Sequence, residues 1–188
     1  MPARSNLLKM NNGKIKILVI PGSLRQDSSN NRVINQIASL VRENIEFNIY
    51  KDLGKLPHCD GEEGYVIIDK WRKQIQESDG ILICTPEYAF GVPGTLKNAL
   101  DWTVSSGDFY DKPVALITAS SVGDKGHASL LQTLTAVTAK MNDDTKLLIP
   151  FIRSKFNEKG ELDSSTLGAI ENVFKNLIDL IEVNGQHE

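Results

Sequence analysis

Short apolar runs alternate along the chain with segments in which apolar residues recur at helical spacing. Most of the runs are apolar at consecutive positions, which is typical of parallel strands covered on both faces. The pattern predicts five strands, over residues 15–20, 45–50, 80–84, 113–119 and 146–150. A stretch with a repeat of three to four residues follows each strand and predicts a helix.

The predicted helices each present one apolar face. The residues expected on these faces are Val33, Ile34, Ile37, Ala38 and Val41, then Val66, Ile67, Trp71 and Ile75, then Leu96, Ala99 and Leu100, then Leu130, Leu131, Leu134 and Val137, and finally Leu167, Ile170, Phe174, Leu177 and Ile181. Alternating strands and helices favour right-handed crossovers and a parallel sheet between two helix layers. Ligands bind beyond the carboxyl ends of such strands, where the winding reverses. The loops after the first, third and fourth strands therefore form the candidate site.

The composition is ordinary for a globular protein of one domain. The chain has 188 residues, 40% of them hydrophobic, and a net charge of -3, which argues against binding nucleic acid or anionic lipid through bulk charge. No apolar stretch approaches the roughly 20 residues that span a membrane. Residues 1–13 lack the apolar region of a secretory signal and are interpreted as a disordered arm before one domain at residues 14–184.

Two cysteines are present, Cys59 in a polar loop and Cys84 inside an apolar run. They give no disulfide framework and no metal-ligand spacing. Free thiols fit a reducing compartment, so we expect a cytoplasmic protein without a bound metal.

The segment "PGSLRQDSSNN", residues 21–31, joins the first strand to the first helix. Its glycine allows close backbone approach, its hydroxyls and the free N–H groups of the helix start can donate to oxygen, and Arg25 offers a planar guanidinium. The segment has neither a Walker lysine nor the G-x-G-x-x-G pattern, which favours a monophosphate. A second interpretation stays open, in which Ser28 or Ser29 merely caps the helix and Arg25 points to water.

A second motif, "TPEYAFGVPGTLKNALDW" at residues 85–102, comes directly after the third strand. Together with "GSLRQDSSN", it resembles the NAD(P)H-dependent FMN reductase family, which includes quinone, chromate and azo-dye reductases. The resemblance extends over essentially the whole chain from Lys14 onward. It implies a flavodoxin-like three-layer α/β sandwich with a five-stranded parallel sheet in the order 2-1-3-4-5 and FMN at its carboxyl edge.

The resemblance also implies a set of cofactor-binding residues. Those at the phosphate are Ser23, Arg25, Ser28 and Asn30, with Ser29 at the position of a ligand-lining apolar residue. Those along the isoalloxazine ring, largely through backbone groups, are Pro86, Glu87, Tyr88, Ala89, Phe90 and Gly91. The loop after the fourth strand completes the pocket with Ser120, Ser121 and Gly123. Tyr88 and Phe90 either lie on the ring or plug the core, and both readings stay open.

The sequence departs from the family pattern at three places. Ala89 stands where asparagine is usual, Gly91 stands where serine is more common, and Lys125 and His127 surround a single Gly126 where paired glycines are common. We expect these changes to alter substrate preference more than FMN binding.

The implied function is transfer of hydride from NADPH or NADH, through FMN, to a small acceptor such as a quinone, an azo compound, chromate or free flavin. The chemistry belongs to the cofactor, so no catalytic acid or base is assigned, and His127 receives no proton-transfer role. The segment "LKNALDW" resembles the family helix that joins the site to a subunit interface, which implies a homodimer or homotetramer. Lys97 and Asp101 within it can serve recognition between subunits or form an ordinary surface pair.

Two other functions fit the same fold class. A flavodoxin-type electron carrier would keep its flavin and dock with protein partners, but such carriers are typically strongly acidic. A response-regulator receiver domain would need acidic residues at the end of the first strand, where this chain has Pro21 and Gly22.

Overall fold

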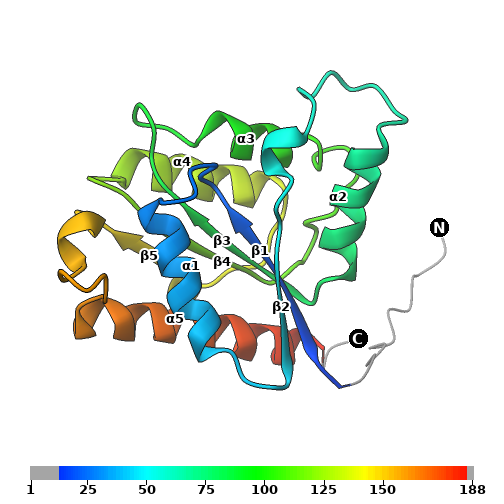
Figure 1. The fold of residues 1–188 in the computed structure, drawn as a ribbon. Coiled ribbons are helices and arrows are strands. Elements are labelled where there is room, and N and C mark those ends of the chain that lie inside the picture. Colours follow the sequence, from blue (N-terminus) through cyan, green and yellow to red (C-terminus); the bar gives the residue numbers. More distant parts are fainter. Residues whose placement is uncertain (1–12, 186–188) are drawn as a thin grey trace.

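Five parallel strands form one sheet in the order β2-β1-β3-β4-β5 in the computed structural model, which describes residues 13–185 (Figure 1). The strands are β1 (Ile15–Pro21), β2 (Ile45–Ile49), β3 (Gly80–Thr85), β4 (Val114–Ala119) and β5 (Lys146–Ile149). The α-helices are α1 (Ser29–Leu40), α2 (Val66–Glu77), α3 (Gly94–Asp101), α4 (Asp124–Ala136) and α5 (Ser164–Asn184), and the 3₁₀ turns are η1 (Leu53–Lys55), η2 (Asp143–Thr145) and η3 (Ile152–Lys155). The predicted α/β fold and strand order are confirmed, and each strand matches its predicted range within one residue at either end. The expected disordered arm lies outside the described residues except for Gly13.

Two hydrophobic cores cover the two faces of the sheet, because successive side chains of a strand point to opposite sides. In β1, Ile17 and Val19 pack with α1 and α5, whereas Leu18 and Ile20 pack with α2, α3 and α4. Figure 1 shows the same division, with α1 and α5 on one side of the sheet and the other three helices opposite. Every residue of β3 and β4 is buried, as consecutive apolar positions predict for central strands.

The predicted apolar faces of the helices match the buried faces with two corrections, one in α1 and one in α2. Ala38 is exposed, because it lies at the edge of the stripe formed by Val33, Ile34 and Ile37. Val66 was expected in the core, but its side chain is 66% exposed, and Ile68 is buried in its place. Ile68, Trp71 and Ile75 lie three and four residues apart, so they form one stripe toward the sheet. Val66 is the first residue of the helix and lies off this stripe. Within residues 13–185, none of the helices has the length and apolar character needed to cross a membrane.

The carboxyl ends of β1 and β3 approach each other unusually closely. Gly22 follows β1, and its N–H donates to the Cys84 carbonyl at 2.8 Å. A Cβ atom on Gly22 would lie 2.1 Å from Thr85 Oγ1, a distance that no real side chain tolerates. Glycine at this position therefore lets the loop after β1 and the loop after β3 begin side by side, which brings the two sequence motifs to one edge of the sheet.

Candidate functional site

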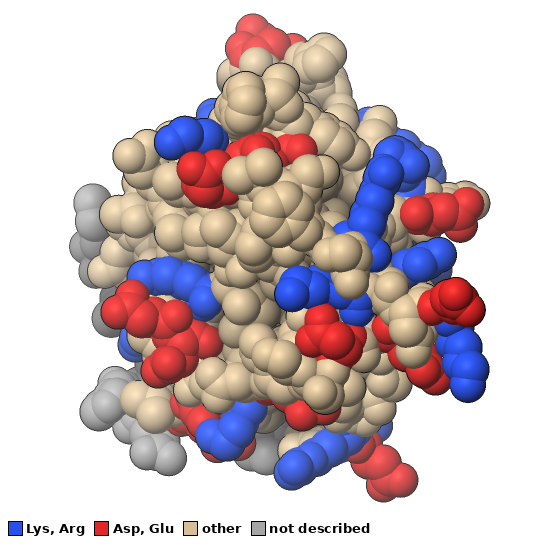
Figure 2. Space-filling model, turned by 90° about the vertical axis from the view of Figure 1, so that its left-hand side faces the viewer, with Lys and Arg blue, Asp and Glu red and all other residues tan. Residues whose placement is uncertain are grey.

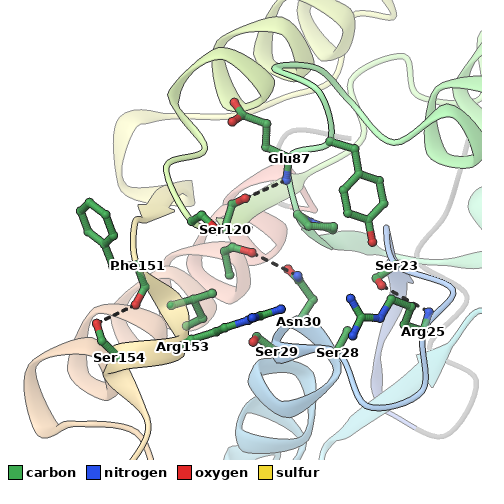
Figure 3. Close-up of a pocket in the computed structure, with 15 residues that line it drawn as sticks. Ser23, Arg25, Ser28, Ser29, Asn30, Glu87, Ser120, Phe151, Arg153 and Ser154 are labelled. Carbon is green, nitrogen blue, oxygen red and sulfur yellow. Dashed lines mark hydrogen bonds between the residues drawn. The ribbon is translucent and has the colours of Figure 1, made fainter.

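A cavity of about 490 Å³ opens at the carboxyl edge of the sheet (Figure 3). Its size lies within the range of small-molecule and cofactor sites. The predicted residues that line it are Ser23, Arg25, Ser28, Ser29, Asn30, Pro86, Glu87, Tyr88, Ser120 and Ser121. The predicted residues outside its lining are Ala89, Phe90, Gly91 and Gly123. The loops after β1, β3 and β4 thus meet around one space, as the strand order requires.

The start of α1 presents open hydrogen-bond donors to this cavity. Ser28 is the N-cap, and its Oγ accepts from the Asn31 N–H at 3.1 Å. The N–H groups of Ser29 and Asn30 come before the first internal bonds of the helix and have no acceptor within residues 13–185. The capping role considered for Ser28 is therefore real, but it leaves the Ser28 hydroxyl proton and two backbone donors available to an anion.

Arg25 and the loop that carries it are held in place by local bonds. The Arg25 N–H donates to Ser23 Oγ at 3.3 Å, and Asn31 Nδ2 donates to the carbonyls of Arg25 and Gln26 at 2.9 Å each. The Arg25 guanidinium has no ion-pair partner in the described part of the chain and lies beside Ser28 in Figure 3. Arg25 is exposed and also lines the cavity, so its guanidinium is available to a ligand there.

Asn30 has a structural role that the sequence motif did not reveal. Its side chain is buried, and Nδ2 donates to the Ala119 carbonyl at 3.1 Å. The Cys84 thiol donates to Asn30 Oδ1 at 3.4 Å, and burial raises the pKa of this thiol, which keeps it protonated. Asn30 thus joins α1 to the ends of β3 and β4, and the group it offers to a ligand is its backbone N–H.

The residues after Glu87 form a tight two-residue hairpin. The Tyr88 N–H donates to the Gly91 carbonyl at 3.0 Å, and the Gly91 N–H donates back to the Tyr88 carbonyl at 2.9 Å. Between them Ala89 and Phe90 have φ angles of 48° and 60°, the left-handed conformation of a type I′ turn. This conformation costs roughly 1–2 kcal/mol for a residue with a side chain, and asparagine tolerates it better than alanine. Asparagine, the usual residue of the family pattern, therefore suits this left-handed backbone better than Ala89 does.

This turn leaves two backbone donors open next to the cavity. The N–H groups of Ala89 and Phe90 have no acceptor among residues 13–185. Tyr88 and Phe90 are exposed, with 48% and 75% of their surfaces accessible, so the reading in which they plug the core is wrong. The turn can therefore present both N–H donors and aromatic surface to a flat ligand.

Glu87 connects this turn to the start of α4. Its carboxylate accepts from the Gly126 N–H at 2.6 Å and from the Gly123 N–H at 3.3 Å, while its own N–H donates to Ser120 Oγ at 3.2 Å. A Cβ atom on Gly126 would lie 2.9 Å from Glu87 Cγ, so glycine is required where the two segments meet. In Figure 3 the Glu87 side chain points away from the arginines, which makes it a positioning residue for the loop.

His127 is in the first turn of α4 and does not belong to the cavity lining. Its Nδ1 is 2.8 Å from Thr118 Oγ1 on β4. Burial and, to a smaller extent, the positive charge of Lys146 lower the pKa of His127 below 6.5. A neutral imidazole that is hydrogen-bonded to Thr118 is consistent with a structural role for His127.

One wall of the cavity was missed by the sequence analysis. It comes from the end of β4 and from the loop after β5, with the residues Ala119, Phe151, Ile152, Arg153 and Ser154. For the residues from Phe151 to Ser154, the only signal available was their position after the fifth strand, because parallel strands share one carboxyl edge. No run of small hydroxyl residues or glycines marks the segment.

The lining of the cavity contains two arginines, Arg25 and Arg153, and one acidic residue, Glu87. Figure 2 shows lysines and arginines interspersed with aspartates and glutamates on the face that it draws. Residues 13–185 contain no group of three or more histidine, cysteine or acidic side chains that could hold a metal ion. The site therefore offers hydrogen-bond donors, two arginines and aromatic surface, which are the groups that an organic phosphate requires.

The sheet order and these donors define a flavodoxin-like domain with a site for a phosphorylated planar ligand. The family model described as NADPH-dependent FMN reductase matches residues 15–147, and the chain belongs to this family. The Escherichia coli K12 quinone reductase is 33% identical over 167 residues, which cover 82% of this chain and 88% of that protein. A 2-hydroxy-1,4-benzoquinone reductase from a Burkholderia species is 34% identical over 160 residues, covering 80% and 86% respectively.

A solved structure supports the same assignment. The flavoenzyme NAD(P)H:(acceptor) oxidoreductase FerB from Paracoccus denitrificans superposes with a TM-score of 0.76 at 26% identity, covering 89% of this chain and 97% of that one. Membership of the family makes the chain an oxidoreductase enzyme that uses FMN and a nicotinamide nucleotide, as the resemblance implied. The match favours this reading over the electron-carrier alternative.

Proposed function

We propose that this enzyme transfers hydride from NADPH or NADH, through FMN, to a small acceptor such as a quinone, an azo compound, chromate or free flavin. The observation that carries the proposal is the cavity itself, whose lining combines the open donors at the start of α1 with Pro86, Glu87 and Tyr88 from the loop after β3. The relatives named as quinone reductases support quinones among the acceptors. Bound FMN would supply the redox chemistry, by accepting hydride and passing it on.

The residues of the chain would hold the cofactor at its two ends. Ser23, Arg25 and Ser28, with the N–H groups of Ser29 and Asn30, would bind the phosphate. Pro86, Tyr88 and the turn from Ala89 to Gly91 would lie along the ring, with the N–H groups of Ala89 and Phe90 as donors. Glu87 would keep that turn in place, and the segment from Ser120 to Gly123 would close the cavity. Because these donors are preformed, little conformational entropy is lost on binding.

We further propose that the enzyme is a cytoplasmic homodimer or homotetramer whose catalytic domain is residues 14–184. Cys59 and Cys84 are both free thiols, which fits a reducing compartment. Val104 and Tyr110 are exposed in the turns between α3 and β4, and apolar surface of this kind supports an interface. The Lys97–Asp101 ion pair on α3 is solvent-exposed and available to such an interface.

Arg25 gives the direct test of the cofactor assignment. The Arg25→Ala variant is expected to bind FMN about 10- to 100-fold more weakly, the effect of one charge-assisted hydrogen bond, with unchanged far-UV circular dichroism. FMN affinity is measured by quenching of flavin fluorescence, and oxidation of NADPH and NADH is followed with a quinone added. Arg42→Ala, an exposed arginine beyond the far end of α1, serves as the control. Equal FMN affinity of the two variants would contradict the phosphate assignment.

A further inference from the structure

Arg153 belongs to the wall of the cavity that the sequence motifs do not mark. The chain leaves β5 through Phe151, whose φ of 53° is left-handed and turns the backbone sharply. The Phe151 and Ile152 N–H groups then donate to the carbonyls of Ser121 and Ser120, at 3.1 Å each, and the Ile152 side chain is buried in the core. A strained residue held by such neighbours frequently serves a site. The residue placed over the cavity as a result is Arg153.

The Arg153 guanidinium reaches into the cavity without a protein partner. In Figure 3 it extends from the β5 loop toward Ser29 and Asn30, while Arg25 lies on the other side of these residues. No ion pair or hydrogen bond engages its guanidinium within residues 13–185. The nearby basic residue Lys155, by contrast, pairs with Asp163 at 4.0 Å.

The cavity therefore holds more positive than negative charge close to the start of α1. Glu87 is the only acidic residue in its lining, and the Glu87 carboxylate is engaged by the amides of α4. A phosphate monoester carries a charge of about -1.5 to -2 near neutral pH, so Arg25 alone would leave it partly uncompensated. Two guanidinium groups on opposite sides of one helix start match such a dianion in charge and can bind its oxygens in a planar fork.

We propose that Arg153 is the second guanidinium that binds the flavin phosphate, opposite Arg25, and that it selects phosphorylated flavin over riboflavin. This inference rests on the proposed function, since it takes FMN as the occupant of the cavity. It assigns a ligand-binding role to the loop after β5. The start of α1 alone would then account for only part of the preference for FMN.

The test compares two flavins that differ only in the phosphate group. FMN and riboflavin are titrated against wild type, Arg153→Gln and Lys159→Gln, with dissociation constants from flavin fluorescence. Lys159 is an exposed cation six residues further along the same segment and is the matched control. Arg153→Gln is expected to raise the FMN dissociation constant about tenfold and to leave the riboflavin constant unchanged. Added salt should weaken FMN binding less in this variant than in wild type, because one screened charge is gone.

Two results would overturn the proposal. The first is an FMN constant for Arg153→Gln equal to that of wild type, and a raised KM for NADPH but not for NADH in this variant would then assign Arg153 to the nucleotide. The second is an equal loss of affinity for FMN and riboflavin, which would reveal a change in the shape of the cavity. If the wild-type protein bound no FMN, the proposed function itself would be refuted. This result differs from FMN binding that is unaffected by Arg153→Gln, which would refute only the role of Arg153.

Discussion

Replacing Glu87 by glutamine should destabilise the enzyme through the start of α4, a helix that has no cap of its own. The N-cap of α4 is Gly123, which has no side chain to accept a hydrogen bond. Glu87 supplies the acceptor from the loop after β3, with bonds of 2.6 Å to the Gly126 N–H and 3.3 Å to the Gly123 N–H. In Glu87→Gln, one of these oxygen acceptors becomes an NH₂ donor that faces another donor.

The size of the effect follows from the lost bond and the lost charge. A hydrogen bond to a charged group contributes about 1.5–3 kcal/mol, and a negative charge at a helix start adds about 0.3–1 kcal/mol. Glu87 is only partly buried, and the remaining amide oxygen can keep one bond, so the expected loss is about 1–2 kcal/mol. For a chain of this size each kcal/mol lowers Tm by about 2–4 °C, which gives a total fall of about 2–8 °C.

Thermal unfolding followed by circular dichroism at pH 7.5 measures this fall. The control is Asp124→Asn, which removes an acidic side chain from the first turn of α4 that makes no bond to the helix amides. This control should lose only the charge contribution, about 0.3–1 kcal/mol. If Tm fell equally in the two variants, the bonds between Glu87 and the glycine amides would add no stability beyond that of a charge at the helix start. The capping argument would then be refuted.

Two further predictions concern His127 and Ala89. Because the pKa of His127 is lowered below 6.5 in the folded state, the unfolded chain takes up the proton first, so stability falls as pH drops below about 6.5. His127→Gln should lose less stability than wild type between pH 7.5 and 5.5 in urea unfolding, and parallel losses would disprove the assignment. Ala89→Asn should stabilise the type I′ turn by about 0.5–1 kcal/mol at neutral pH, and a lower urea midpoint would contradict the strain inferred at that position.

The strands and helices could be predicted because the apolar patterns that specify them are local and recur along the chain. Consecutive apolar residues in β3 and β4 indicate strands buried on both faces, and α5 shows its buried face through the spacing of Ile170, Phe174 and Leu177. Val66 shows the limit of this reasoning, since an apolar residue at a helix end matches the pattern but not the buried stripe. The strand order itself came from the resemblance carried by the two motifs.

The candidate site likewise has one part that the sequence predicts and another part that only the tertiary structure shows. The donors of the helix start after β1 can be read from sequence, because capping and turn chemistry depend on a few adjacent residues. The bonds of Glu87 to α4 join residues 36 and 39 positions apart, and the Asn30–Ala119 bond joins residues 89 apart. Arg153 likewise reaches the cavity only because β5 lies beside β4. Such pairings depend on which strands are neighbours and on how closely the backbones pack. They are therefore decided by the tertiary structure and could not be predicted from local sequence patterns.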